Sequence, residues 1–118
     1  MVNNFKLAEY VNIVVIVPET HADSMREVMG KAGAGKMGNY SFASFSVKGT
    51  GHFKPDEKAT PFIGQANKLE TVAEERIETI CHKDILEKVV EEIKKAHPYE
   101  NTVIDIFPIY EIGFKIKK

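Results

Sequence analysis

The segment His97-Pro98-Tyr99-Glu100 carries the residue types in this sequence that are best suited to metal chemistry. An imidazole and a carboxylate three residues apart can act as a borderline and a hard ligand to a divalent cation. The structural alternative is a helix end, with a histidine near the negative end of the helix dipole, a proline that stops the helix and a packed tyrosine. We favour that alternative, keep His97 and Glu100 as candidate metal ligands, and expect the segment to form an exposed corner.

The other soft or borderline ligands are scattered along the chain. His21 follows the first predicted strand, His52 falls in a long predicted loop, and Cys81-His82 stands at a strand end. No pair has the C-x-x-C or H-x-x-x-H spacing of a strong metal site. The sequence therefore predicts no defined metal centre, and a divalent metal is the one cofactor that it leaves open.

A glycine-rich segment, Gly33-Ala34-Gly35-Lys36-Met37-Gly38, matches the G-x-G-x-x-G pattern. A dinucleotide-binding fingerprint follows a strand and opens a helix, whereas this segment follows a helix and opens a strand. The pattern is more typical of a helix exit, and capture of an anion by backbone amides and a lysine is the alternative. Glycines stand beside lysines again in the next loop. The candidate ligand-binding residues, with the corner tyrosine included, are Gly35, Lys36, Gly38, Gly49, Gly51, Lys54, Lys58, Gly64 and Tyr99.

Three glutamates around Arg76, namely Glu74, Glu75 and Glu78, could form a pair for acid–base catalysis. Strand alternation instead spreads them over both faces of a strand, which indicates an ordinary exposed, charge-rich strand. No G-x-S-x-G motif is present, and Cys81 lacks the context of a catalytic triad. We therefore expect a non-enzymatic protein and leave an enzyme open as the alternative.

Hydrophobic periodicity predicts the elements that must position these residues. The first half of the chain contains a strand over 11–17, a helix from Thr20 or Asp23 to about Ala32, and a strand over 40–47. The second half contains a strand over 68–81 with a kink near Ala73-Glu74, a helix from about Asp84 to Pro98, a strand over 102–107 ended by Pro108, and a short edge strand in the tail 109–118. Between the halves, a Gly- and Pro-rich excursion over 49–65 is long enough to suggest a functional loop.

The order of these elements predicts the fold. Strand, helix, strand, strand, helix, strand is the α+β ferredoxin-like βαββαβ arrangement, with two helices on one face of an antiparallel sheet. We expect a single domain over 1–118. No helix is left to cover the other sheet face, whose Val, Ile and Phe side chains predict self-association into a closed cyclic oligomer.

Composition excludes several classes of function. The 16 Lys and Arg against 17 Asp and Glu give a net charge of −1, so bulk charge provides no reason to bind nucleic acid or an anionic membrane. No run approaches the roughly 20 apolar residues of a membrane span, and the first residues do not form a signal peptide. One cysteine suits a reducing compartment. We therefore expect a cytoplasmic protein with neither nucleic-acid nor membrane partners.

An ordered set of motifs resembles a known family over about residues 10–110. The chain is similar to the domain inserted in bacterial Nif-three-like dinuclear-metal proteins, also called GTP cyclohydrolase type 2-like, of which stand-alone copies exist. That insert is similar in fold to the CutA and PII signalling proteins, and both groups form trimers. The motifs are Gly38-Asn39-Tyr40-Ser41, Phe45, Gly49-Thr50-Gly51, Phe53-Lys54-Pro55, Pro61-Phe62-Ile63-Gly64, Lys68-Leu69-Glu70, Glu75-Arg76-Ile77-Glu78 and Ala96-His97-Pro98-Tyr99-Glu100.

This resemblance implies a PII/CutA-like trimer that binds a small ligand or a partner in clefts between subunits, lined by the 49–65 loop and the His97–Glu100 corner. PII-like loops sense nucleotides, so an anionic metabolite is the more specific expectation. The dinuclear metal of the longer relatives is held by domains outside this insert. Phe42-Ala43 also stands where many relatives have His-Cys, so neither metal role is carried over.

Two other functions stay open. One is CutA-like divalent-metal binding or metal homeostasis through His97 and Glu100, to which Cys81 or His52 could contribute. The other is an enzyme acting on a nucleotide, which rests only on analogy with the longer relatives.

Overall fold

The computed structural model describes residues 5–114 as a four-stranded antiparallel sheet with two helices. The strands are β1 (Leu7–Pro18), β2 (Phe45–Phe53), β3 (Glu70–His82) and β4 (Ile104–Tyr110). The helices are α1 (Ala22–Ala32) and α2 (Leu86–Ala96), and the short 3₁₀ turns are η1 (Glu19–His21), η2 (Lys83–Ile85) and η3 (Glu111–Gly113). No helix in this part of the chain is long and apolar enough to cross a membrane.

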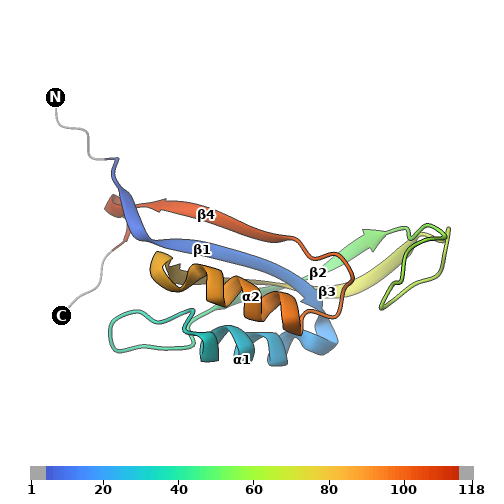
Figure 1. The fold of residues 1–118 in the computed structure, drawn as a ribbon, viewed down its shortest axis with the longest axis horizontal. Coiled ribbons are helices and arrows are strands. Elements are labelled where there is room, and N and C mark those ends of the chain that lie inside the picture. The colour runs from blue at the N-terminus through green and yellow to red at the C-terminus, as the bar shows by residue number, and fades with distance from the viewer. Residues whose placement is uncertain (1–4, 115–118) are drawn as a thin grey trace.

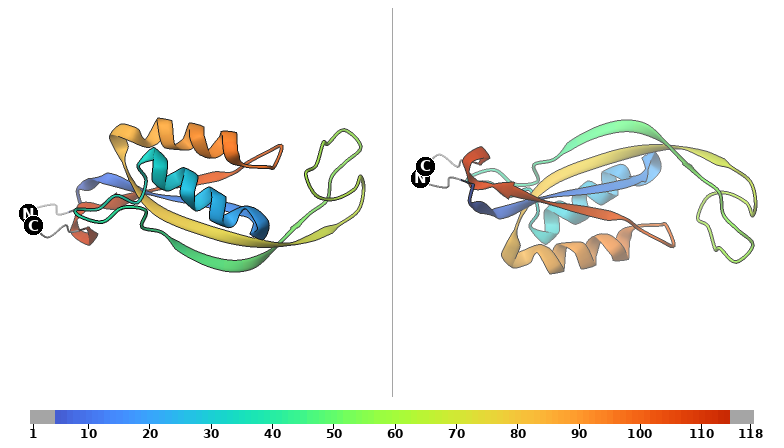
Figure 2. Two further views of the ribbon diagram at one scale, coloured as in Figure 1. Left: turned by 90° about the horizontal axis from the view of Figure 1, so that it is seen from below. Right: turned by 90° about the horizontal axis from the view of Figure 1, so that it is seen from above.

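The strands lie in the order β2-β3-β1-β4, and both helices cover the same face of the sheet (Figures 1 and 2). This confirms the ferredoxin-like α+β fold that the element order predicts. The molecule is elongated, at 55 × 33 × 24 Å, because β2 and β3 extend past the helices and carry the loop over residues 54–69 at their tip (Figure 1). We call β2, β3 and this loop the hairpin arm.

The core lies between the helices and the face of the sheet that they cover. The β-branched run of β1 supplies alternate side chains that point toward the helices, and Ile13 and Val15 are fully buried. Complete burial of one such side chain contributes about 1.5–3 kcal/mol. Met25 and Met29, one helical turn apart on α1, close the core from one side, and α2 closes it from the other with Val89 and Ile93.

Both helices end where the sequence predicts. Gly33 takes the left-handed conformation at φ 109°, and its N–H donates to the Gly30 carbonyl, so the chain leaves α1 in a glycine C-cap. The second helix stops at His97, the residue before Pro98, whose backbone is extended. α1 begins at Ala22, between Thr20 and Asp23, the two residues from which the helix is expected to start, and neither of them is its cap. The N-cap is His21, and its side chain makes no capping hydrogen bond.

The opposite face of the sheet has no helix over it, and we call it the open face. Cross-strand register places Ile16, Arg76 and Val47 side by side there, because Ile16 pairs with Arg76 and Arg76 pairs with Val47. Ile16 and Val47 are exposed, as are Phe45 and Phe107 at neighbouring positions of the same face. Apolar side chains therefore do stand on the uncovered side of the sheet.

The second strand and the long loop lie further along the chain than predicted. β2 begins at Phe45 because the preceding residues turn: Met37 and Tyr40 form an isolated bridge, and Phe42 has a positive φ of 58°. The glycines of GTG are consequently strand residues, and the loop spans 54–69 instead of 49–65.

Three smaller expectations are also wrong. β4 continues through Pro108, because a proline is tolerated on an edge strand. The pairing of β3 shows no irregularity at Ala73-Glu74, and the register shift lies between β1 and β4. Residues 111–113 form η3 rather than part of an edge strand, and 115–118 lie outside the described residues.

Candidate functional site

A cleft of about 710 Å³ opens between the hairpin arm, the open face and the segment that follows α2. Its floor comes from β1 through Val14 and Ile16 and from β3 through Glu74. One wall is the arm, over residues 51–63, and the other is the segment 97–105. Five of its side chains are aromatic or imidazole rings, those of His52, Phe53, Phe62, His97 and Tyr99.

The loop over 54–69 owes its shape to contacts of its own. Asp56 Oδ1 accepts hydrogen bonds from the amides of Lys58 and Ala59, at 2.8 and 3.0 Å, which makes a tight turn. The loop base is closed by the backbone N–H of Asn67, which donates to the Pro55 carbonyl at 2.7 Å. A side-chain-held turn and a closed base order this loop without regular secondary structure.

Two contacts join this loop to the rest of the molecule. The Thr60 amide donates to Glu100 Oε1 at 2.7 Å, which connects the loop to the segment after α2. The ring of Phe62 lies edge-on to that of His21, with centroids 5.2 Å apart. Glu100 therefore holds the loop in place, and its hydrogen bond with Thr60 links the two walls of the cleft.

His97 is buried, with 8% of its surface exposed, so the expectation of an exposed corner is wrong. Its Nε2 lies 2.7 Å from the Ile16 carbonyl oxygen, and the Tyr99 amide donates to its Nδ1 at 3.1 Å. A carbonyl only accepts and an amide only donates, so Nε2 carries the proton in this arrangement. Ile16 lies beyond the last residue pair between β1 and β4. The His97 ring therefore takes the place that a β4 residue would have as hydrogen-bond partner of the Ile16 carbonyl.

Tyr99 and Glu74 meet at the floor of the cleft. The Tyr99 hydroxyl donates to Glu74 Oε2 at 2.5 Å, and only 9% of the glutamate surface is exposed. Burial and then the glutamate raise the pKa of the Tyr99 phenol well above its ordinary value, so the hydroxyl keeps its proton and continues to donate. Gly51 makes room for this pair, because a Cβ at that position would overlap Glu74 Oε1.

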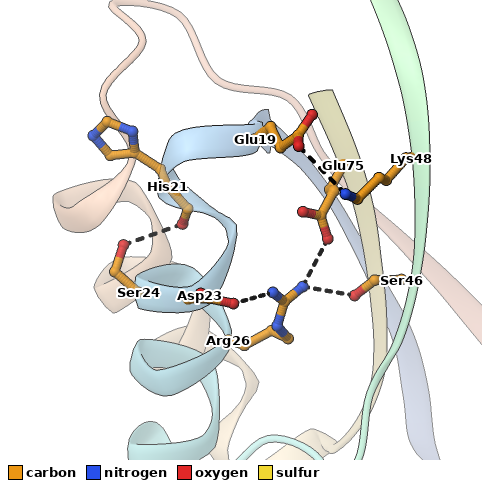
Figure 3. A network of polar contacts seen from close by, with 8 residues as sticks. All are labelled: Glu19, His21, Asp23, Ser24, Arg26, Ser46, Lys48 and Glu75. Atoms are coloured by element: carbon orange, nitrogen blue, oxygen red, sulfur yellow. Dashed lines mark hydrogen bonds and ion pairs between the residues drawn. The ribbon is translucent and has the colours of Figure 1, made fainter. Parts of the chain in front are cut away.

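A polar network on the other side of the sheet fixes the base of the arm (Figure 3). Arg26 of α1 donates to Glu75 of β3 and to Ser46 of β2, each at 2.9 Å, and also pairs with Asp23. Its pKa is raised, chiefly by the hydrogen bond to Glu75. A single residue of α1 thus binds both strands of the arm, β2 and β3.

The structure brings some of the predicted ligand-binding residues together at the cleft and leaves others elsewhere. The lining residues are Gly51, Lys54, Lys58 and Tyr99, and His97 and Glu100 of the corner join them. Gly49 and Gly64 belong to the arm but do not line the cleft. Gly35, Lys36 and Gly38 belong to the segment after α1, which lies at the opposite end of the long axis from the arm (Figure 1). A ligand-binding role for all nine residues stays a prediction.

The backbone of the glycine-rich segment is engaged within the chain. The Gly35 amide donates to the Ile80 carbonyl at 2.7 Å, and its own carbonyl accepts from the Ala43 amide at 3.1 Å. The Met37 amide donates to the Tyr40 carbonyl, which closes the turn. These contacts are those of a helix exit, which is the interpretation that we favoured, and they leave fewer amides to face an anion.

Metal binding by His97 and Glu100 stays a prediction. Both ring nitrogens of His97 have hydrogen-bond partners, so a metal ion would have to displace one of them. Within residues 5–114, no three His, Cys, Asp or Glu side chains come together as a metal site would require. Cys81 is buried away from the cleft, and His52 lines it.

Sequence reasoning missed Glu74 as a residue of the site. Alternation does place Glu74 and Glu75 on opposite faces of β3, but both are buried rather than exposed. The sequence signal that could have found Glu74 is a glycine in one strand placed diagonally to a carboxylate in the next: Gly51 stands two residues from Gly49, the pairing partner of Glu74. That signal depends on the register between β2 and β3, and the misplaced second strand obscured it.

Comparison with known proteins supports the resemblance. The family model described as nitrogen regulatory protein P-II matches residues 10–112. The chain is 50% identical over 101 residues to a GTP cyclohydrolase 1 type 2 homolog of Halalkalibacterium halodurans, covering 86% of this chain and 27% of the relative. It is 42% identical over 97 residues to the homolog of that name from Bacillus subtilis, covering 82% and 26%. The chain spans about a quarter of the length of these curated relatives.

Solved structures show the same pattern. A Bacillus cereus protein related to NIF3 superposes with a TM-score of 0.74 at 41% identity, over 91% of this chain and 27% of that one. The divalent cation tolerance protein CutA from Archaeoglobus fulgidus matches with a TM-score of 0.59 at 16% identity, over 85% and 83%. GlnK of B. subtilis, solved as a complex with ATP, matches with a TM-score of 0.51 at 16% identity, over 85% and 81%. The last two likenesses are of fold alone.

Proposed function

The chain belongs to the nitrogen regulatory protein P-II family, and from this premise we propose that it is a non-enzymatic binding module whose cleft takes a small ligand with an anionic group. The observation that carries the proposal is a cleft of about 710 Å³ with two lysines, Lys54 and Lys58, in its wall. Neither ammonium has an ion-pair partner within the described residues. Two unpaired ammonium groups beside a concave, aromatic-lined space suit a carboxylate or a phosphate.

A nucleotide is the specific anion that the comparisons make worth testing. GlnK, which has a related fold, was solved with ATP, and that description applies to GlnK. In the present chain the supporting features are the two lysines of the loop and the rings around the cleft. The longer relatives carry a cyclohydrolase name, but the chain spans only about a quarter of them, so we do not extend a catalytic activity to it.

We further propose a cytoplasmic homo-oligomer, with a trimer favoured. The exposed apolar side chains of the open face support this, because a second copy could bury them. Closed cyclic assembly is the commonest way for identical chains to bury such a face. In that arrangement the cleft, which borders the open face, would lie close to a neighbouring subunit.

Native mass spectrometry of untagged protein, purified without added metal, tests the assembly. We expect a trimer that retains a nucleotide-sized mass. A bare monomer would contradict the oligomer, and a metal-sized mass would favour metal binding over the anionic ligand.

Calorimetric titration with ATP tests the cleft. The double variant Lys54→Ala/Lys58→Ala is expected to weaken ATP binding by about tenfold or more, since each ion pair with a phosphate in a partly desolvated site contributes on the order of 1 kcal/mol. Lys36→Ala is the matched control, because Lys36 follows α1 in the glycine-rich segment and does not line the cleft. Affinity that is unchanged in the double variant, or reduced only in Lys36→Ala, would overturn the assignment.

Divalent-metal binding through His97 and Glu100 is tested in the same preparation. It predicts stoichiometric uptake of zinc or copper that is lost in His97→Ala. Uptake that is equal in the two proteins would remove His97 as a ligand.

A further inference from the structure

The charges around the cleft do not fit a ligand that is purely anionic. Besides the two lysines, four acidic residues line it: Asp56, Glu74, Glu100 and Asp105. A carboxylate that faces a bound anion repels it, so each acid must be engaged within the chain, be screened by solvent, or meet a complementary part of the ligand.

Two of these acids serve the loop. Asp56 accepts two loop amides through Oδ1, and Glu100 accepts the Thr60 amide through Oε1. Asp105 is an exposed residue of the edge strand β4, where solvent screens its charge. Glu74 differs from all three, because it is buried in the floor of the cleft on the central part of the sheet.

The geometry leaves one oxygen of Glu74 available. Tyr99 donates to Oε2, whereas Oε1 has no hydrogen-bond partner in the described part of the chain. Every fully buried side-chain oxygen and nitrogen among residues 5–114 does have a partner, so Oε1 is not sealed from solvent. Oε1 lies against Gly51, a residue without a side chain that also lines the cleft. The floor of the cleft therefore contains a carboxylate that Tyr99 holds and whose second oxygen is unpartnered and not completely buried.

We propose that the ligand is polar at two ends, with an N–H donor group that binds Glu74 Oε1 in the floor and an anionic group that binds Lys54 and Lys58 in the loop. This inference rests on the proposed function and names the chemistry of its ligand. Tyr99 is a positioning residue, since its hydroxyl holds the carboxylate in place. The donor can be an amine, an amidine or an amino group on a ring, because each presents N–H to a carboxylate.

Three probes that share an anionic end test the donor end. ATP carries an amino group on its ring, ITP carries an acceptor oxygen at the same position with its N–H on the adjacent ring nitrogen, and inorganic tripolyphosphate has no ring. Each is titrated calorimetrically into the full chain. We expect ATP to bind about tenfold or more tightly than ITP, because a hydrogen bond to a carboxylate is replaced by two facing acceptors.

The variant Glu74→Gln sharpens the test. Its amide oxygen can still accept from Tyr99, which places the amide nitrogen, a donor, where Oε1 was. The preference for ATP over ITP is expected to fall to about twofold or to reverse, while tripolyphosphate affinity stays unchanged. Glu78→Gln, on the same strand outside the cleft, is the matched control and is expected to keep the preference. Circular dichroism and native mass confirm that both variants fold and assemble as the parent does.

The possible failures are distinguishable. If none of the three probes binds, or if Lys54→Ala/Lys58→Ala leaves all of them unchanged, the proposed function fails and the two-ended ligand fails with it. If the lysines matter but ATP and ITP bind equally to the parent, or Glu74→Gln keeps the preference, only the donor role of Glu74 is overturned.

Discussion

The two ends of the long axis both carry glycines beside lysines, yet they use these residues differently. At the exit of α1, the amides of Gly33, Ala34 and Gly35 all donate to carbonyls of the chain. At the hairpin arm, the ammonium groups of Lys54 and Lys58 and one oxygen of Glu74 have no partners among residues 5–114 and lie beside a cleft. Because buried backbone groups must be satisfied, a glycine turn that packs against its own helix and strand has little left for a ligand. Engaged backbone amides at one end and a cleft at the other, more than residue type, separate the two ends.

The largest expected effect is at the helix exit. Gly35→Ala would put a Cβ against the backbone of Ala43, in contact with its carbonyl oxygen and 2.7 Å from its nitrogen, at a φ of +80°. Left-handed strain and this overlap are expected to lower the free energy of unfolding by about 3 kcal/mol. Urea denaturation measures the loss.

Gly49→Ala is the control for that substitution. Gly49 stands in β2, and the position that a Cβ would take there is open space with nothing within 4 Å, so the expected change is below about 0.5 kcal/mol. Equal losses in the two variants would mean that the turn after α1 is no more tightly packed than an exposed strand.

At the arm, Gly51→Ala is expected to have the second-largest effect. The added methyl group would displace Glu74 Oε1 and separate the carboxylate from Tyr99, at a loss of about 2 kcal/mol in unfolding free energy. ATP and ITP would also bind this variant with equal affinity if Glu74 accepts a hydrogen bond from the N–H donor group of the ligand. Retention of both stability and preference would show that Glu74 has freedom to move, and the contrast between the ends would weaken.

Tyr99→Phe removes the hydroxyl that holds Glu74 and is expected to lower stability by about 1.5 kcal/mol. The pH dependence identifies the cause. The folded pKa of Tyr99 is raised above the ordinary 10.0 of the unfolded chain, so the contribution is complete below pH 10 and declines as pH rises beyond it. The difference between parent and variant, measured by urea denaturation from pH 7 to 11, should shrink above pH 10. Tyr40→Phe is the control, because Tyr40 is exposed. If the stability difference between the parent and Tyr40→Phe shrinks above pH 10 in the same way, Tyr99 is not the source of the pH dependence.

Glu100→Gln is expected to have the smallest effect, because Glu100 is exposed and its amide counterpart still accepts from Thr60. Global stability should change by less than about 0.5 kcal/mol. Locally, exchange of the Thr60 amide with deuterium should become a few times faster, because a hydrogen bond to a charged acceptor becomes one to a neutral acceptor. Glu87→Gln, on the outer side of α2, should leave that amide unchanged. Equal rates in all three proteins would mean that Glu100 does not hold the loop.

Much of the fold could be predicted from local patterns. The β-branched run of the first strand, the stripe of Met25 and Met29, and the stops at Gly33 and Pro98 each act within a few residues. The second strand was misplaced because aromatic residues 40–45 favour a strand locally, whereas the pairing with β3 selects Phe45–Phe53. Strand limits depend on a partner in a way that helix limits do not.

The site was predicted in part for the same reason. Lys54, Lys58 and Tyr99 were candidates by type, and the structure places all three at one cleft. The sequence by itself determined the order of the elements, the helix ends and the apolar excess that leaves one sheet face uncovered, because propensity and periodicity are local. Only the tertiary structure decided that His97 is buried with both ring nitrogens hydrogen-bonded. It also decided that Glu74 accepts from Tyr99 through Oε2 while Oε1 lies beside Gly51. Those states depend on register and on contacts between residues far apart in the chain, such as 81 positions between His97 and Ile16.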